Sequence, residues 1–86
     1  MEIKKELIKR EIAGDTILVP VGKSVYDSNG LFVINELGAF LWERLPEAED
    51  ESVLLAAVLE EYEVTEAEAA RDIHEFLLQL KKLEII

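Results

Sequence analysis

The sequence predicts an α+β domain in which an N-terminal three-stranded antiparallel sheet precedes three helices, similar to a winged helix-turn-helix. The first third of the chain is rich in β-branched residues separated by turn residues, which is typical of strands. The remainder carries apolar residues at helical spacing, and each such stretch follows a residue that favours a helix N-cap. With 86 residues, the chain has room for a single domain, residues 1–86, and not for two.

The strands come first. Residues 8–12 and 16–21 alternate in the β pattern, and residues 13–15 between them supply the turn, so together they predict a hairpin. Pro20 cannot donate a ladder hydrogen bond and therefore marks a strand end or an edge position. After a connecting segment, the apolar run 31–34 predicts the third strand.

The first helix is predicted from Asn35 as N-cap to Pro46, which stops it. Gly38 inside this helix costs roughly 1 kcal/mol relative to alanine, which indicates that another backbone approaches closely there. The apolar positions recur at four-residue spacing, and two aromatic residues near them are expected in the core: Leu37, Leu41, Leu45, Phe40 and Trp42.

The second and third helices are predicted to begin after Asp50 and after Thr65, where Thr65 and Glu68 form a capping-box pattern. Val64 is expected to tuck into the turn between them. The apolar stripe of the second helix is Leu54 or Leu55, Val58, Leu59 and Tyr62. That of the third is Ala69, Ile73, Phe76, Leu77, Leu80 and Leu83.

The composition excludes several classes of function. A net charge of −10 opposes binding to nucleic acids and to anionic membranes, and the chain contains no cysteine and no apolar run long enough to span a bilayer. His74 is the only imidazole, and no calcium-loop or phosphate-loop spacing is present. We therefore expect a cytoplasmic protein that is not an enzyme and needs no metal or cofactor.

A small open sheet leaves an edge with free backbone donors and acceptors, to which an extended peptide can add. If residues 31–34 form that edge, peptide side chains would enter a groove beside a helix. Two alternatives stand beside this: the strand lies centrally in the sheet, or it is covered by the segment 22–30, which reads as a loop or as a second hairpin arm closed at Asn29 and Gly30.

The sequence resembles the PqqD-like family at two motifs and across nearly the whole chain. The first motif is a strand followed by Asn-x-x-Gly-Ala and a tryptophan, here Leu31-Phe32-Val33-Ile34-Asn35-Glu36-Leu37-Gly38-Ala39-Phe40-Leu41-Trp42. The second is Glu61-Tyr62-Glu63-Val64-Thr65, then Glu68 and Ala69-Ala70-Arg71-Asp72-Ile73, then Phe76-Leu77. This chain departs from the family pattern in its longer segment 21–29 and in Ile34, where leucine is usual.

The resemblance implies a recognition element that binds the leader segment of a ribosomally made precursor peptide for a separate modifying enzyme. The family adds the leader as a strand to the third strand, and the third helix forms the other wall. A radical S-adenosylmethionine enzyme is the expected partner, acting in trans. Carried to this chain, the expected peptide contacts are Leu31, Phe32, Val33, Ile34, Ala70, Arg71, His74 and Leu78.

Two other functions fit the same pattern of elements. The last two helices could form the helix-turn-helix of a DNA-binding regulator. However, Glu66 and Glu68 occupy positions where the recognition helix of a DNA-binding protein has basic or amide side chains. The free sheet edge could also pair with a second copy in a structural or dimerisation module. The expected state is a monomer or a weak homodimer.

Overall fold

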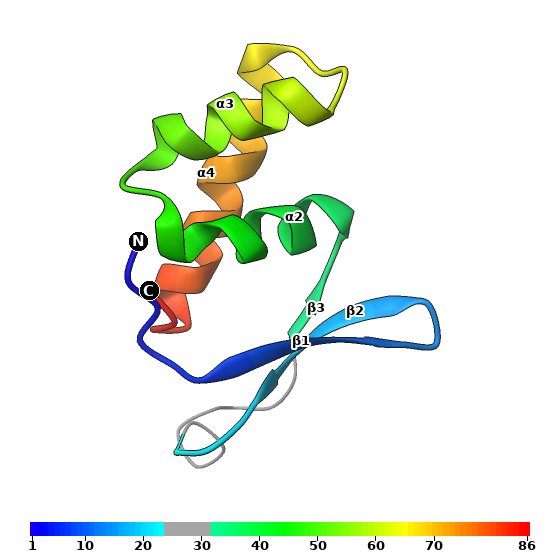
Figure 1. The fold of residues 1–86 in the computed structure, drawn as a ribbon, viewed down its shortest axis with the longest axis vertical. Helices are drawn as coiled ribbons and strands as arrows, with labels where there is room; N and C mark the ends of the chain where they lie inside the picture. Colours follow the sequence, from blue (N-terminus) through cyan, green and yellow to red (C-terminus); the bar gives the residue numbers. More distant parts are fainter. Residues whose placement is uncertain (24–31) are drawn as a thin grey trace.

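The computed structural model describes residues 1–23 and 32–86, so the segment with Asn29 and Gly30 lies outside the described residues. The elements are β1 (Leu7–Ile12), β2 (Asp15–Pro20), β3 (Phe32–Ile34), α2 (Glu36–Arg44), a 3₁₀ turn η1 (Leu45–Glu47), α3 (Glu51–Glu61) and α4 (Glu66–Lys82). Figure 1 shows the sheet at one end of the molecule and the helices stacked at the other. The predicted order of three strands before three α-helices is confirmed in the described part of the chain.

The sheet is antiparallel, with the strand order β1-β2-β3. Ala13 and Gly14 connect β1 to β2, and both have positive φ angles, as a tight two-residue hairpin turn requires. Leu18 pairs with Phe32 across β2 and β3, and its side chain is fully buried. Because side chains alternate along a strand, this register places one face of the sheet against the helices.

Side-chain caps begin all three of the α-helices in the described residues. Asn35 Oδ1 accepts the Gly38 N–H at 2.8 Å, and Thr65 Oγ1 accepts the Glu68 N–H at 3.1 Å. The Asp50 carboxylate accepts the backbone N–H groups that follow it, at 2.9 and 3.4 Å. These contacts satisfy amides that have no partner within the helix, so the predicted N-caps are confirmed.

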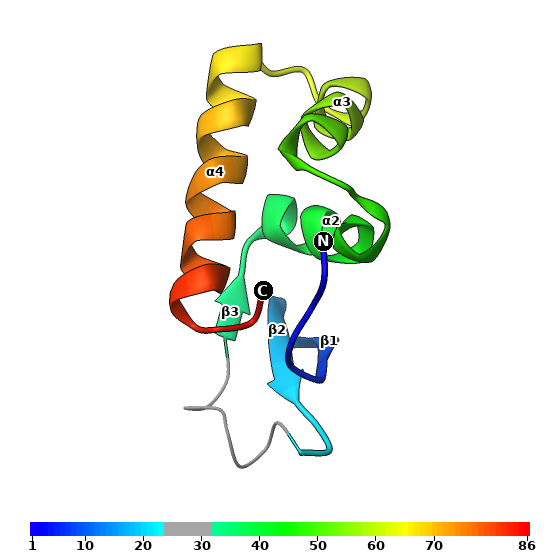
Figure 2. The ribbon, with the colours of Figure 1, turned by 90° about the vertical axis from the view of Figure 1, so that its left-hand side faces the viewer.

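The core lies between the sheet and the helices, and α4 runs along one side of the molecule down to the sheet (Figure 2). Both chain ends pack against it. The Met1 amino group donates to the Leu45 carbonyl at 2.8 Å and to that of Ala48, while the Lys4 N–H donates to the carbonyl of the fully buried Ile85 at 2.6 Å. Each layer contributes a leucine that is less than 2% exposed: Leu18, Leu41, Leu54 and Leu77.

Two expectations for the helical region are wrong. Val64 does not tuck into the turn but is 41% exposed, and Leu59, expected on the apolar stripe of its helix, is 38% exposed. The contact of α3 with the core is narrow, since Leu54 and Val58 are its buried residues. None of the helices in the described ranges has the length and apolar character needed to cross a membrane.

An ion pair connects β1 to α2: Lys9 Nζ donates a hydrogen bond to Glu43 Oε1. This hydrogen bond, together with the charge of Lys9, lowers the pKa of Glu43. A carboxyl with a lowered pKa in the folded state adds stability above its ordinary pKa of about 4.3, and that contribution is lost as the pH falls through the lowered value.

We therefore predict that Glu43→Gln lowers the melting temperature slightly at pH 7 and that the difference from the unsubstituted protein closes in acid. Melting curves between pH 7 and pH 2 measure it. The effect is small because the pair is solvent-exposed. A difference that stayed constant over this range would contradict the assignment of the effect to the ionised carboxylate.

Candidate functional site

β3 is an edge strand within the described residues. It pairs with β2 on one side, and no described strand pairs with its other side. The backbone N–H and C=O groups on the open side of such a strand are available to another extended segment. Its central side chain, Val33, is 67% exposed and lies at the surface.

A groove of about 950 Å³ lies beside this strand and is bounded by β3, the first turns of α2 and one side of α4. Its apolar lining comes from all three elements: Val33, Ile34, Leu37, Gly38, Leu41, Phe76 and Leu78. Its polar lining comes mostly from α4: Asp15, Asn35, Asp72, Glu75, Gln79 and Lys82. The groove therefore has an apolar lining shared by three elements and a polar lining that comes mostly from one wall, α4.

Close packing around Gly38 forms the floor of the groove. A Cβ atom added at Gly38 would lie 3.1 Å from Ile34 Cβ and 3.1 Å from Phe76 Cε1. It would also lie 3.2 Å from Asn35 Oδ1, the atom that caps α2. The expectation that another backbone approaches this glycine is wrong, because the three nearest atoms belong to side chains. The missing side chain leaves room for Ile34 of β3 and Phe76 of α4 to pack against α2.

The charged groups of the groove are exposed at its rim. Asp72 and Glu75 project from α4, Asp15 stands at the start of β2, and Lys82 ends α4. Asp72 Oδ1 is 3.8 Å from Arg71 Nε, a distance that indicates a weak ion pair. The rim therefore has three carboxylates and one ammonium group, which favours ligands carrying positive charge.

The structure places the predicted contact residues in three groups. Val33, Ile34 and Leu78 line the groove, and Leu78 is 43% exposed. Phe32 is half-buried against the core, and Leu31 lies outside the described residues.

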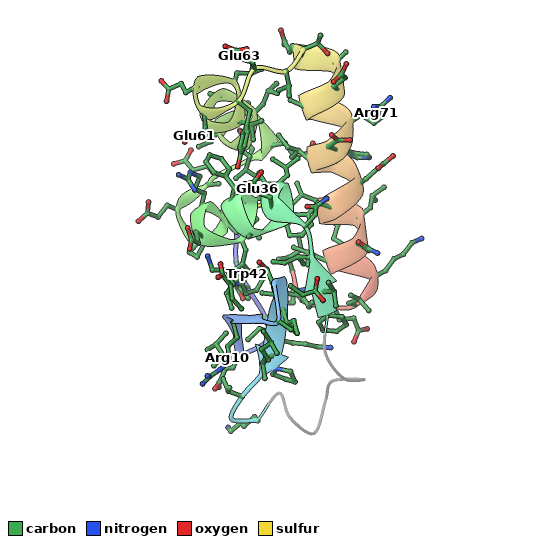
Figure 3. The ribbon with its side chains drawn as sticks, turned by 90° about the vertical axis from the view of Figure 1, so that its right-hand side faces the viewer. Arg10, Glu36, Trp42, Glu61, Glu63 and Arg71 are labelled. Atoms are coloured by element: carbon green, nitrogen blue, oxygen red, sulfur yellow. The ribbon has the colours of Figure 1, made fainter. Side chains whose placement is uncertain are left out.

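Ala70, Arg71 and His74 are exposed on α4 but do not line the groove. His74 Nδ1 lies 3.3 Å from Glu51 Oε1 at the start of α3, so this side chain is directed toward the neighbouring helix. Arg71 projects to the outer side of α4, away from α2 (Figure 3). Whether any of these residues contacts a peptide stays a prediction.

Reading the sequence alone identified Leu78 but missed the other α4 residues that line the groove. Each residue of an α-helix turns the side-chain direction by about 100°. Arg71 and His74 each precede a lining residue, Asp72 or Glu75, by one position. The signal that could have identified this wall is a set of polar residues on the same side of the helix as Phe76. They follow one another at intervals of three or four residues: Asp72, Glu75, Gln79 and Lys82.

Other chemistry has little support in the described residues. Residues 1–23 and 32–86 contain no group of three or more histidine, aspartate or glutamate side chains placed to hold a metal ion. The Asp50 carboxyl has a lowered pKa because of the Ser52 hydroxyl and the Val53 N–H, and it caps α3 away from the groove.

Comparison with known proteins agrees with this geometry. A family model described as coenzyme PQQ synthesis protein D (PqqD) matches residues 16–86. The structure titled "TbiB1 in Complex with the TbiA(beta) Leader Peptide" is similar, with a TM-score of 0.73 and 22% identity over 99% of this chain and 93% of that one. A lasso peptide synthetase B1 complexed with its leader peptide is also similar, with a TM-score of 0.70 and 22% identity over 94% and 89% of the two chains.

A search of curated proteins found no match. At 22% identity, the two solved structures show that this chain shares their fold. The family model covers most of the chain, including the capped start of α2 and the whole of α4. The chain therefore belongs to the PqqD family.

Proposed function

We propose that this protein binds the leader segment of a ribosomally made precursor peptide and presents it to a separate modifying enzyme. The observation that carries the proposal is the open edge of β3 beside a groove with an apolar floor. A leader strand added to β3 gains main-chain hydrogen bonds, and alternate side chains enter the groove over Ile34 and Phe76. Val33, Ile34 and Leu78 are the proposed contacts among the residues predicted from the sequence.

The fold neighbours support the same proposal, because both are complexes with leader peptides. By holding a leader near the enzyme, a recognition protein raises the local concentration of the substrate without taking part in the chemistry. We propose a radical S-adenosylmethionine enzyme as the partner, and a monomer or weak homodimer as the working state. Binding through backbone pairing and apolar contacts requires no cofactor.

DNA binding is not supported by the distribution of charge. The first turn of α4, which would enter the major groove in a winged helix, carries Glu66 and Glu68. Phosphate contacts depend on lysine and arginine, and carboxylates at this position would repel the backbone.

The proposal is tested by recording amide chemical shifts of the labelled protein while a synthetic leader peptide, encoded beside its gene, is added. We expect the largest shifts at β3 and on the groove wall of α4, at Asp72, Glu75 and Gln79. Shifts at Ala70 and His74 should be smaller, since these residues lie outside the groove. No shift with the correct leader would contradict the proposal.

Peptides methylated at single backbone nitrogens provide the control for strand addition. Methylation removes one donor and adds bulk at the edge, so at alternate positions it should weaken binding roughly tenfold or more. At the intervening positions, whose N–H groups point away from β3, the loss should be small. A uniform effect along the peptide would show that the ligand is not held as a strand.

A further inference from the structure

The charges of the groove are arranged unevenly along its length. Asp72 and Glu75 project from α4 above the apolar floor, whereas Lys82 lies at the C-terminal end of that helix. At 1.5 Å per residue, Asp72 and Lys82 are about 15 Å apart along the helix axis. About four to five extended residues span this distance. An extended ligand therefore meets negative charge at one end of the groove and positive charge at the other.

β3 fixes how a ligand strand would run past these charges. Thr16 pairs with Ile34, so Asp15 lies beyond the C-terminal end of β3 and adds a third carboxylate to the lining of the groove. β3 points toward the N-terminal half of α4, which carries Asp72, and α4 runs in the opposite direction (Figures 2 and 3). A strand antiparallel to β3 therefore runs in the same direction as α4, with its N-terminal part beside Asp72.

Antiparallel addition is the favoured orientation. β3 already pairs antiparallel with β2, and antiparallel ladders are slightly more stable per residue than parallel ones. The apolar floor at Gly38, Ile34 and Phe76 would then receive the central side chains of the ligand.

From these three features, and resting on the proposed leader binding, we infer that the groove selects peptides by the order of their charged residues along the sequence. It selects leader segments in which a lysine or arginine precedes a short apolar stretch and an acidic residue follows it. Asp72 and Glu75 are the specificity-determining residues for the cationic side chain of the leader. Lys82 is the specificity-determining residue for its acidic side chain.

The whole protein carries a charge of −10 and would attract any cationic peptide, so the test separates local selection from this general attraction. The double variant Asp72→Asn/Glu75→Gln removes two charges from the groove. The matched control Glu60→Gln/Glu61→Gln removes two charges from exposed positions at the end of α3, outside the groove. Both variants have the same net charge.

The probe is a displayed library of random 12-residue peptides, selected separately on the full-length protein and on each double variant. We expect lysine and arginine to be enriched at least ~threefold on the N-terminal side of the apolar stretch relative to its C-terminal side. The groove variant should lose this preference, and the α3 variant should keep it. For one enriched peptide, exchanging the charged residues between its two ends should weaken binding to the original protein about tenfold.

The outcomes distinguish the inference from the function on which it rests. Selection that enriches no peptide contradicts leader binding itself. Peptides that bind without a charge order, or with the reverse order, overturn the inference and leave leader binding in place. Equal loss of the preference in the two double variants also overturns it, because the effect would then come from net charge alone.

Discussion

Leu78→Ala should weaken leader binding roughly fivefold to thirtyfold while leaving the stability of the fold nearly unchanged. Leu78 is 43% exposed and lines the groove, so a bound peptide would cover side-chain surface that is now in water. Burying such surface contributes about 1–2 kcal/mol to binding, which gives this change in Kd. Titration by calorimetry or fluorescence anisotropy with the synthetic leader measures the effect.

The preceding residue provides the matched control. Leu77 is 1% exposed and belongs to the core, so Leu77→Ala should lower the free energy of unfolding by about 2–5 kcal/mol. A chain of 86 residues has roughly 4–13 kcal/mol in total, and this variant should show a clearly lower midpoint in urea. If both leucines affected stability equally, or if Leu78→Ala bound the leader normally, the assignment of the groove would be wrong.

Gly38→Ala should destabilise the protein by about 1 kcal/mol, although alanine in place of glycine ordinarily stabilises a helix by about that amount. The added Cβ would press on Ile34 Cβ, on Phe76 Cε1 and on the capping oxygen of Asn35. In a densely packed region these atoms can move only at a cost. Because the strain falls on the floor of the groove, leader affinity should also decrease. Urea unfolding and leader titration measure the two effects.

Double-variant cycles can assign the strain to particular atoms. Phe76→Leu removes the ring atom that meets the new Cβ, so combined with Gly38→Ala it should cost less than the sum of the two single changes. Ile34→Val keeps its Cβ and should give no such relief. Additive effects in both cycles would show that the loss at Gly38 has another origin.

Local signals in the sequence were sufficient for the elements and for the start of each α-helix. The side chains of Asn35, Asp50 and Thr65 cap helices within a few residues of their own positions, so their roles depend on neighbours in the chain. Gly38 was also informative, because glycine inside a helix is costly unless something requires the space. Periodicity likewise identified the buried stripe of α4, with Ala69, Ile73, Leu77 and Leu80.

The placement of side chains outside that stripe was harder to predict. Leu59 and Val64 are apolar and lie close in sequence to the core residue Val58, yet both are exposed. The reason is that α3 contacts the core along a narrow strip. The N-terminal amino group contacts the carbonyls of Leu45 and Ala48 more than forty residues away, and nothing in the local sequence indicates this.

The sequence by itself determined the fold class, the helix caps, the family and β3 as the strand beside which a ligand would lie. The tertiary structure decided which side of α4 faces that strand. A helix with a buried stripe has two polar flanks, and the composition of α4 does not distinguish the flank of His74 from that of Asp72 and Glu75. The packing of Phe76 against Gly38 sets the rotation of α4, and a rotation of about 100° separates neighbouring residues on a helix. That contact joins α4 to α2, which lies far earlier in the sequence, so only the folded chain could show it.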